Sequence, residues 1–114
     1  MKRFNPLQPD PEAVPPEEVR FLELKVVPWE DTHRLKVHVR LTPFQKPPDL
    51  EFEIWDIEKK ALASAYIVEN IDFEFVITLH LRVKTESNQD LTLHASILYE
   101  DTGVVHEKEV AFHL

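Results

Sequence analysis

The chain has 114 residues and a formal net charge of −8, which suits a single domain and disfavours nucleic acid as a partner, because nucleic-acid binding depends on Lys and Arg displacing counterions. It contains no cysteine and one glycine, which excludes disulfides, thiolate metal sites and cysteine nucleophiles, as well as glycine-rich phosphate cradles, and we expect no cofactor. No apolar run approaches the roughly 20 residues of a membrane span, so we expect a cytoplasmic protein without a membrane partner.

The N-terminal segment, residues 1–18, carries five prolines with acidic residues between them. It has no apolar stretch behind its first basic residues and is therefore not expected to be a signal peptide. Proline fixes φ and lacks an N–H donor, so neither a helix nor an inner strand is expected here. We interpret residues 1–18 as a proline-rich extended or disordered tail, either a spacer or a docking segment, and residues 19–114 as the folded domain.

From Val19 onward, apolar and polar residues alternate with a period of two, which indicates half-buried antiparallel strands. In the first strand Leu22 and Leu24 are predicted to point inward. The alternation is cleanest over residues 34–42, and 61–69 alternates poorly, which suggests an edge strand. Further strands are expected over residues 50–55, 73–83, 91–99 and 104–114.

Two turns carry clear signals. Glu58-Lys59-Lys60 is predicted to be a tight polar turn. Glu100-Asp101-Thr102-Gly103 is predicted to be a type I turn closed by a left-handed residue, which explains why the one glycine of the chain lies there. Seven strands separated by such turns predict an all-β fold, a seven-stranded antiparallel immunoglobulin-like β-sandwich with an extended N-terminal tail.

In strand count and spacing the chain resembles immunoglobulin-like and fibronectin-type sandwiches. It lacks their cysteine pair, and Asp90-Leu91-Thr92 stands where a tyrosine corner would be, so it looks like a divergent bacterial type. The stretches 42–48, 78–82 and 97–100 are similar to those of small, uncharacterised bacterial proteins. This resemblance implies a fold, and it implies no activity and no site residues.

Six histidines are the candidate catalytic or metal-ligating residues. His38 and His80 fall on the outer faces of two strands that are adjacent and antiparallel in an immunoglobulin-like order, so their imidazoles could be cross-strand neighbours. A zinc site needs three or four ligands, and no acidic residue completes the set. We therefore interpret them as solvated surface histidines, like His94 and His113, and assign no catalytic residue and no metal ligand.

Charge separates between the two predicted outer faces. One face collects Lys25, Arg34, Lys36, His38, Arg40, His80, Arg82 and Lys84, and the other collects Glu51, Glu53, Glu107 and Glu109 with Trp55. Ordinary solubilising charge explains such faces, and the alternative is a recognition or self-association surface.

Trp55 has outward parity beside Glu51 and Glu53. We favour its coverage by the tail, an edge strand or a second subunit. The alternatives are an exposed binding platform and a bulge that returns the indole to the core.

These features favour a non-enzymatic protein-interaction module with a protein partner or self-association. Its candidate surface consists of Lys36, His38, Arg40, His80, Arg82 and Trp55. Two alternatives stay open: a small-ligand or carbohydrate binder that uses Trp55, Tyr66 and Phe44, and a histidine-based metal site.

Overall fold

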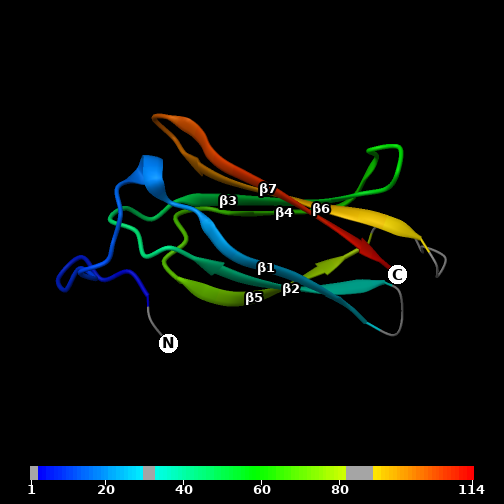
Figure 1. Cartoon of the computed structure of the whole chain (residues 1–114), viewed down its shortest axis with the longest axis horizontal. Helices are drawn as coiled ribbons and strands as arrows, with labels where there is room; N and C mark the ends of the chain where they lie inside the picture. The colour runs from blue at the N-terminus through cyan, green and yellow to red at the C-terminus, as the bar shows by residue number, and fades with distance from the viewer. Residues whose placement is uncertain (1–2, 30–32, 82–88) are drawn as a thin grey trace.

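The computed structural model describes residues 3–29, 33–81 and 89–114, which form two layers of antiparallel strands (Figure 1). The elements are η1 (Pro16–Glu18), β1 (Phe21–Pro28), β2 (Arg34–Leu41), β3 (Asp49–Trp55), β4 (Ala61–Ile67), β5 (Glu74–His80), β6 (Asp90–Tyr99) and β7 (Gly103–His113). One sheet has the order β1-β2-β5 and the other β4-β3-β6-β7. The prediction of an all-β fold with seven antiparallel strands is confirmed.

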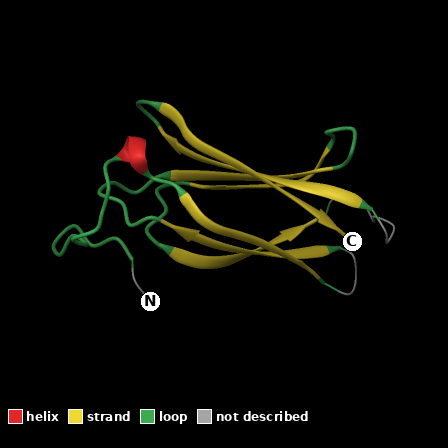
Figure 2. Ribbon diagram, viewed as in Figure 1, coloured by secondary structure: helices red, strands yellow, loops and turns green. Residues whose placement is uncertain are grey.

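The hydrophobic core lies between the two sheets, which Figure 2 shows as stacked layers joined by loops at both ends. This core includes Leu35 and Val37 from β2, Phe52 from β3 and Leu93 from β6, and all four are fully buried. Their neighbours in sequence are more exposed, as the period of two requires. No helix of the described residues is long and apolar enough to cross a membrane.

The first strand corrects one predicted detail. Leu22 is 46% exposed, whereas Phe21 and Leu24 are buried. A bulge between Phe21 and Glu23 interrupts the pairing of β1 with β2. Because a bulge inserts one extra residue, it reverses the side-chain alternation at that point, so the prediction that Leu22 points inward is wrong.

Both predicted turns are present. Gly103 has a φ of +80°, and Lys59 has a φ of +64°, so each turn places one residue in the left-handed region. In the β3–β4 turn, Oδ1 of Asp56 accepts hydrogen bonds from the backbone N–H groups of Glu58 and Lys60, at 2.8 and 2.9 Å. This acceptor holds Lys59 in a conformation that glycine adopts at lower cost.

The N-terminal segment packs against the sandwich, whereas an extended or disordered tail was predicted. The Phe4 backbone N–H donates to the Ile71 carbonyl at 2.7 Å, and the Phe4 ring stacks on Phe44 with centroids 6.2 Å apart. Val14 forms a parallel bridge with Phe44. In Figure 1 this segment, drawn in blue, lies against one end of the sandwich. Proline kept it out of the sheets, as expected, but the apolar residues Phe4 and Val14 fix it to the fold.

Two side chains connect segments that are distant in sequence. The Phe21 backbone N–H donates to Nδ1 of His106 at 3.1 Å, which joins β1 of one sheet to β7 of the other. The hydroxyl of Tyr99, in β6, donates to the Lys46 carbonyl at 2.7 Å and so holds the loop between β2 and β3. Burial raises the pKa of Tyr99 well above its ordinary value.

Candidate functional site

The outer side of the β1-β2-β5 sheet forms what we call the basic face. Its described members are Lys25, Arg34, Lys36, His38, Arg40 and His80. Arg82 and Lys84, which were also predicted to belong to it, lie outside the described residues. At one end Arg40 pairs with Glu23 of β1 and Glu74 of β5, so two carboxylates flank it and the positive charge there is offset.

The basic face includes one exposed tryptophan that sequence reasoning did not single out. The Arg34 guanidinium lies 4.1 Å from the centre of the Trp29 ring, and the Lys36 ammonium lies 5.1 Å from it. Both distances are within the range of cation–π attraction. Trp29 directly follows β1, and Arg34 and Lys36 lie at the start of β2, the next strand of the same hairpin. Residues at the two ends of a hairpin connection lie close together, so this spacing could have revealed the cluster.

His38 and His80 lie on the same face but are not neighbours. His38 pairs with Val76, and His80 pairs with Arg34. His38 lies four positions from Arg34 along β2, which corresponds to about 13 Å along a strand. The strands β2 and β5 are adjacent and antiparallel as expected, but the register separates the imidazoles. Among the described residues no group of three or more His, Asp or Glu side chains could hold a metal ion.

The outer side of the β4-β3-β6-β7 sheet forms the acidic face. It consists of Glu51, Glu53, Glu107 and Glu109 together with Trp55, Tyr66, His94 and Ser96. The predicted grouping of Trp55 with these four carboxylates is confirmed by the register.

Two rows of side chains cross the acidic face at right angles to the strands. In the first, Ser96 of β6 lies between Glu51 and Glu107. In the second, His94 lies between Glu53 and Glu109. Neighbouring strands are about 4.8 Å apart, so the two carboxylate positions of a row are separated by about 10 Å. Each row therefore places a carboxylate on both sides of the central residue, Ser96 or His94.

Trp55 points outward, as predicted, and His94 covers it. Their ring centroids are 4.7 Å apart and their planes differ by 11°. The ring that covers it belongs to β6, a central strand of the sheet, and not to the tail or edge strand that we favoured. The register shift between Ile54 and Trp55 does not return the indole to the core.

His94 is not the solvated histidine that was predicted, because its side chain is only 15% exposed. Its Nε2 lies 3.8 Å from a carboxylate oxygen of Glu107, and its Nδ1 is buried without a hydrogen-bond partner. Strand parity placed His94 on this face correctly. Its burial follows from the indole two strand positions away, on the neighbouring strand, which parity alone does not reveal.

The residues considered for carbohydrate binding do not form one platform. Phe44 is 1% exposed and packs with Phe4 and Phe73 at the end where the N-terminal segment lies. Tyr66 pairs with Glu51, which lies four positions from Trp55 along β3. The Tyr66 hydroxyl donates to the Asp49 carboxylate at 3.1 Å. These three aromatic rings therefore serve different parts of the fold.

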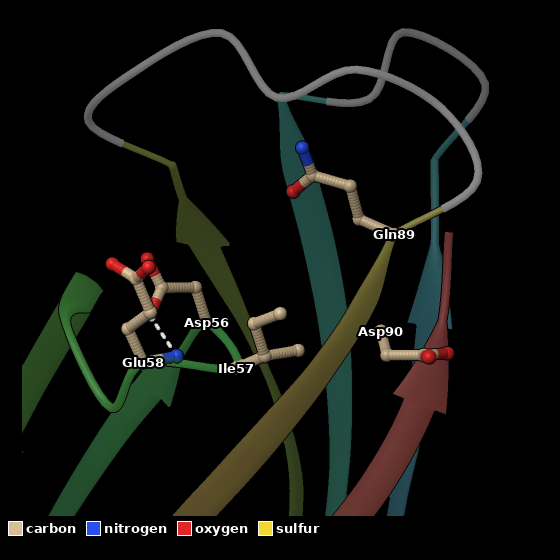
Figure 3. Close-up of a pocket in the computed structure, with 5 residues that line it drawn as sticks. All are labelled: Asp56, Ile57, Glu58, Gln89 and Asp90. Atoms are coloured by element: carbon tan, nitrogen blue, oxygen red, sulfur yellow. Dashed lines mark hydrogen bonds between the residues drawn. The ribbon is translucent and has the colours of Figure 1, made fainter.

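An open pocket of about 480 Å³ lies at the end of the sandwich that carries the β3–β4 turn. Figure 3 shows its carboxylates pointing in different directions: Asp56 and Glu58 lie on one side, and Asp90 points toward β7. Asp56 accepts turn hydrogen bonds, and Asp90 lies 2.8 Å from Nδ1 of His113. Because each has a local partner and they do not converge, this arrangement does not form a cation site.

Comparison with known proteins identifies the fold and no family. No family model matches the chain, and no curated protein matches it. Among solved structures, it is similar to a glycosyl hydrolase family 2 member from Bacteroides cellulosilyticus, with a TM-score of 0.63, 20% identity and coverage of 83% of this chain and 14% of that one. A β-glucuronidase from Bifidobacterium dentium gives a TM-score of 0.62 and 12% identity, with coverage of 84% and 18%.

The β-glucuronidase of Ruminococcus gnavus is a further match, with a TM-score of 0.58, 12% identity and coverage of 85% of this chain and 16% of that one. The chain thus spans less than a fifth of these enzymes. At such identities the likeness shows a shared β-sandwich fold and carries no activity to this chain.

Proposed function

We propose that this chain is an immunoglobulin-like, non-enzymatic interaction module that binds a positively charged segment of a partner protein on its acidic face. The immunoglobulin-like assignment is supported by the strand orders β1-β2-β5 and β4-β3-β6-β7 and by the likeness to sandwich domains within larger chains. The observation that carries the function is the two rows that cross the acidic face, each with one carboxylate from β3 and one from β7.

The first row provides a place for a cationic side chain. Ser96 is small and 3% exposed, and it lies between Glu51 and Glu107. A Lys or Arg side chain placed over Ser96 comes within reach of both carboxylates. Such an interaction stabilises a complex most where the partner excludes water, and it also speeds association through electrostatic steering.

The second row adds an aromatic group next to the charge. Trp55 borders His94, which is flanked by Glu53 and Glu109. A cation over an indole is attracted by the ring quadrupole, and tryptophan is enriched among the residues that dominate protein interfaces. His94 occupies one face of the indole, so a partner group has only the rest of the ring, and the flanking carboxylates favour a cationic group there.

The proposal is tested by titrating the chain with a Lys/Arg-rich peptide and measuring binding by calorimetry at low and high salt. We expect binding that weakens as salt rises. Glu51→Lys or Glu107→Lys should each weaken it about tenfold or more. The matched control is Glu12→Lys, which makes the same charge change in the exposed N-terminal segment and should have little effect.

Three outcomes would contradict the proposal. Equal weakening by Glu12→Lys would mean that only net charge attracts the peptide. Binding of a Glu/Asp-rich peptide that Lys36→Glu and Arg40→Glu weaken, with no binding of the Lys/Arg-rich peptide, would move the site to the basic face. Binding of a glycan, with a change in tryptophan fluorescence that Trp55→Phe abolishes and no peptide binding, would favour the carbohydrate alternative.

A further inference from the structure

The edges of the two sheets differ in how well they are protected against pairing with another strand. β1 carries Lys25 at its centre, a bulge near its start and Pro28 at its end. β7 carries Glu107-Lys108-Glu109 at its centre. Charges, bulges and proline are the features by which natural proteins prevent edge-to-edge association, so these two strands are protected.

β5 lacks such protection. Its five central residues, Phe75–Leu79, carry no charge, proline or glycine, and its outward-facing Val76 is 51% exposed. Among the described residues no strand pairs with the second edge of β5. β4 is also an edge strand without charge, but it is rich in alanine, which has a low preference for strands.

The backbone groups on this open edge can be assigned from the pairing on the other side. The Leu81 N–H donates to the His33 carbonyl, and the Leu41 N–H donates to the Phe73 carbonyl. Hydrogen bonding alternates along an antiparallel strand, so odd-numbered residues of β5 bond to β2. The even-numbered residues, 74 to 80, therefore direct their N–H and C=O groups toward the open edge.

We propose that the open edge of β5 pairs with β5 of a second copy of this chain, antiparallel and centred on Ile77, to form a continuous six-stranded sheet. This proposal is independent of the acidic face, which lies on the other sheet. In this register Glu74 faces His80 of the second copy, Val76 faces Thr78, and Phe75 faces Leu79. All four even-numbered residues then meet even-numbered residues, as the hydrogen-bonding positions require.

The sequence of β5, Glu-Phe-Val-Ile-Thr-Leu-His, is thus complementary to its own reverse, because polar residues face polar residues at the two ends and apolar residues lie between them. Glu74 already lies beside Arg40 within one copy, and pairing would place it between that guanidinium and the imidazole of the second copy. A shift of the register by two residues keeps the hydrogen-bonding positions but separates Glu74 from His80. The contact between the Glu74 carboxylate and the His80 ring therefore favours the Ile77-centred register, and a two-fold contact of this kind closes on itself as a dimer.

The primary experiment is sedimentation velocity of the whole chain at increasing concentrations, up to about 1 mM. We expect the mass to rise from 13.4 kDa toward twice that value. Added salt should strengthen the association, because each copy has a net charge of −8 and screening reduces the repulsion. A mass that stays at the monomer value at the highest concentration would overturn the proposal.

Variants locate the contact. Val76→Lys should weaken association about tenfold or more, whereas Val104→Lys, at a β7 position that is 49% exposed, should leave it unchanged. Equal effects of the two would exclude the β5 edge. Thr78→Pro removes only an outward N–H and should abolish pairing; the Val76→Lys result decides the matter if this variant does not fold.

Two further variants test the register. Glu74→Lys and His80→Glu should each weaken association, and the double variant should restore it. Since the chain has no cysteine, Ile77→Cys introduces a single thiol at the proposed axis, where paired Cα atoms are about 4.5 Å apart and can form a disulfide. Under oxidising conditions Ile77→Cys should yield a covalent dimer much faster than Val104→Cys. Equal rates would overturn the register.

Discussion

Two hairpin turns each depend on a single residue with positive φ. Gly103 has a φ of +80°, and a Cβ added there would meet nothing within 4 Å. Lys59 has a φ of +64° although it carries a side chain. The left-handed conformation costs an L-residue about 1–2 kcal/mol. A side chain added at residue 103 should therefore lower the stability of the fold, whereas removal of the side chain at residue 59 should raise it.

Gly103→Ala should therefore destabilise the chain by about 1–2 kcal/mol. Lys59→Gly should stabilise it by about 0.5–1 kcal/mol, because glycine removes the strain but adds freedom to the unfolded chain. Urea unfolding of both variants beside the unchanged protein measures the two effects. A loss of stability in both would show that the Lys59 side chain makes contacts that outweigh its backbone strain.

His106 makes stability dependent on pH. Its Nδ1 accepts the Phe21 N–H and can do so only while it is unprotonated. Burial, together with the nearby charges of Arg20 and Lys108, lowers the pKa of His106. At a pH between the folded and unfolded pKa, the unfolded chain binds more protons, so acid favours unfolding. The contribution is fully present above about pH 6.5 and is lost as pH falls through the folded pKa.

The test compares the unchanged protein with His106→Gln, whose amide oxygen can accept the same hydrogen bond without titrating. The advantage of the unchanged protein should shrink as the pH falls from about 8 to about 5. A difference in unfolding free energy that stays constant over this range would rule out His106 as the titrating group.

Among the larger elements, the N-terminal segment acts as part of the fold. Phe4 packs on Phe44 and bonds to Ile71, whereas Leu7, three residues later, is 89% exposed. Phe4→Ala should cost about 2 kcal/mol, less than a fully buried phenylalanine because Phe4 is only partly buried. Leu7→Ala should change stability by less than about 0.5 kcal/mol. Similar values for the two in thermal or urea unfolding would mean that the segment contributes little.

The loop between β2 and β3 depends on Tyr99. Tyr99→Phe leaves the Lys46 carbonyl without its hydrogen-bond donor and should cost about 1–3 kcal/mol. Tyr66→Phe removes a hydroxyl whose hydrogen bond to Asp49 is exposed, and it should cost less than about 1 kcal/mol because water replaces the partner. Urea unfolding separates the two, and equal costs would show that the Tyr99 hydrogen bond is no stronger than an exposed one.

At the scale of the whole molecule, the net charge of −8 opposes compaction. Like charges gather on the acidic face in particular, where Glu53 and Glu109 flank His94. Raising the sodium chloride concentration from about 0.01 to about 0.15 M shortens the Debye length from about 30 to about 8 Å. The unfolding free energy should rise over this range, and a decrease would show that attractive ion pairs dominate.

Alternation predicted this architecture because each strand has one buried face. The alternation over residues 34–42 matches the alternating burial of β2, and the assignment of Glu51, Glu53 and Trp55 to one outer face was also correct. The left-handed position of Gly103 followed from turn chemistry. These features depend only on residues close in sequence. A pattern of period two predicts which face of its own strand a residue occupies, and it does not predict which residues of another strand lie beside it.

The errors arise where distant segments meet. A bulge near Leu22 shifts one strand by a residue, and the register of β2 with β5 separates His38 from His80. The stacking of His94 on Trp55 joins residues 39 positions apart. The proline content of the N-terminal segment suggested an extended or disordered tail. Proline content does not reveal which apolar residues of the segment contact Phe44, and those contacts hold the segment on the fold.

The linkage between β1 and β7 has a mechanical consequence. Both strands run from left to right in Figure 1, with the N-terminal segment at one end of the molecule and Leu114 at the other. A stretching force applied to the two ends would draw β1 and β7 in opposite directions along their own axes. The bonds from Phe21 to His106 and from Arg20 to the Val105 carbonyl would then bear that load in shear, so resistance to stretching should fall in acid.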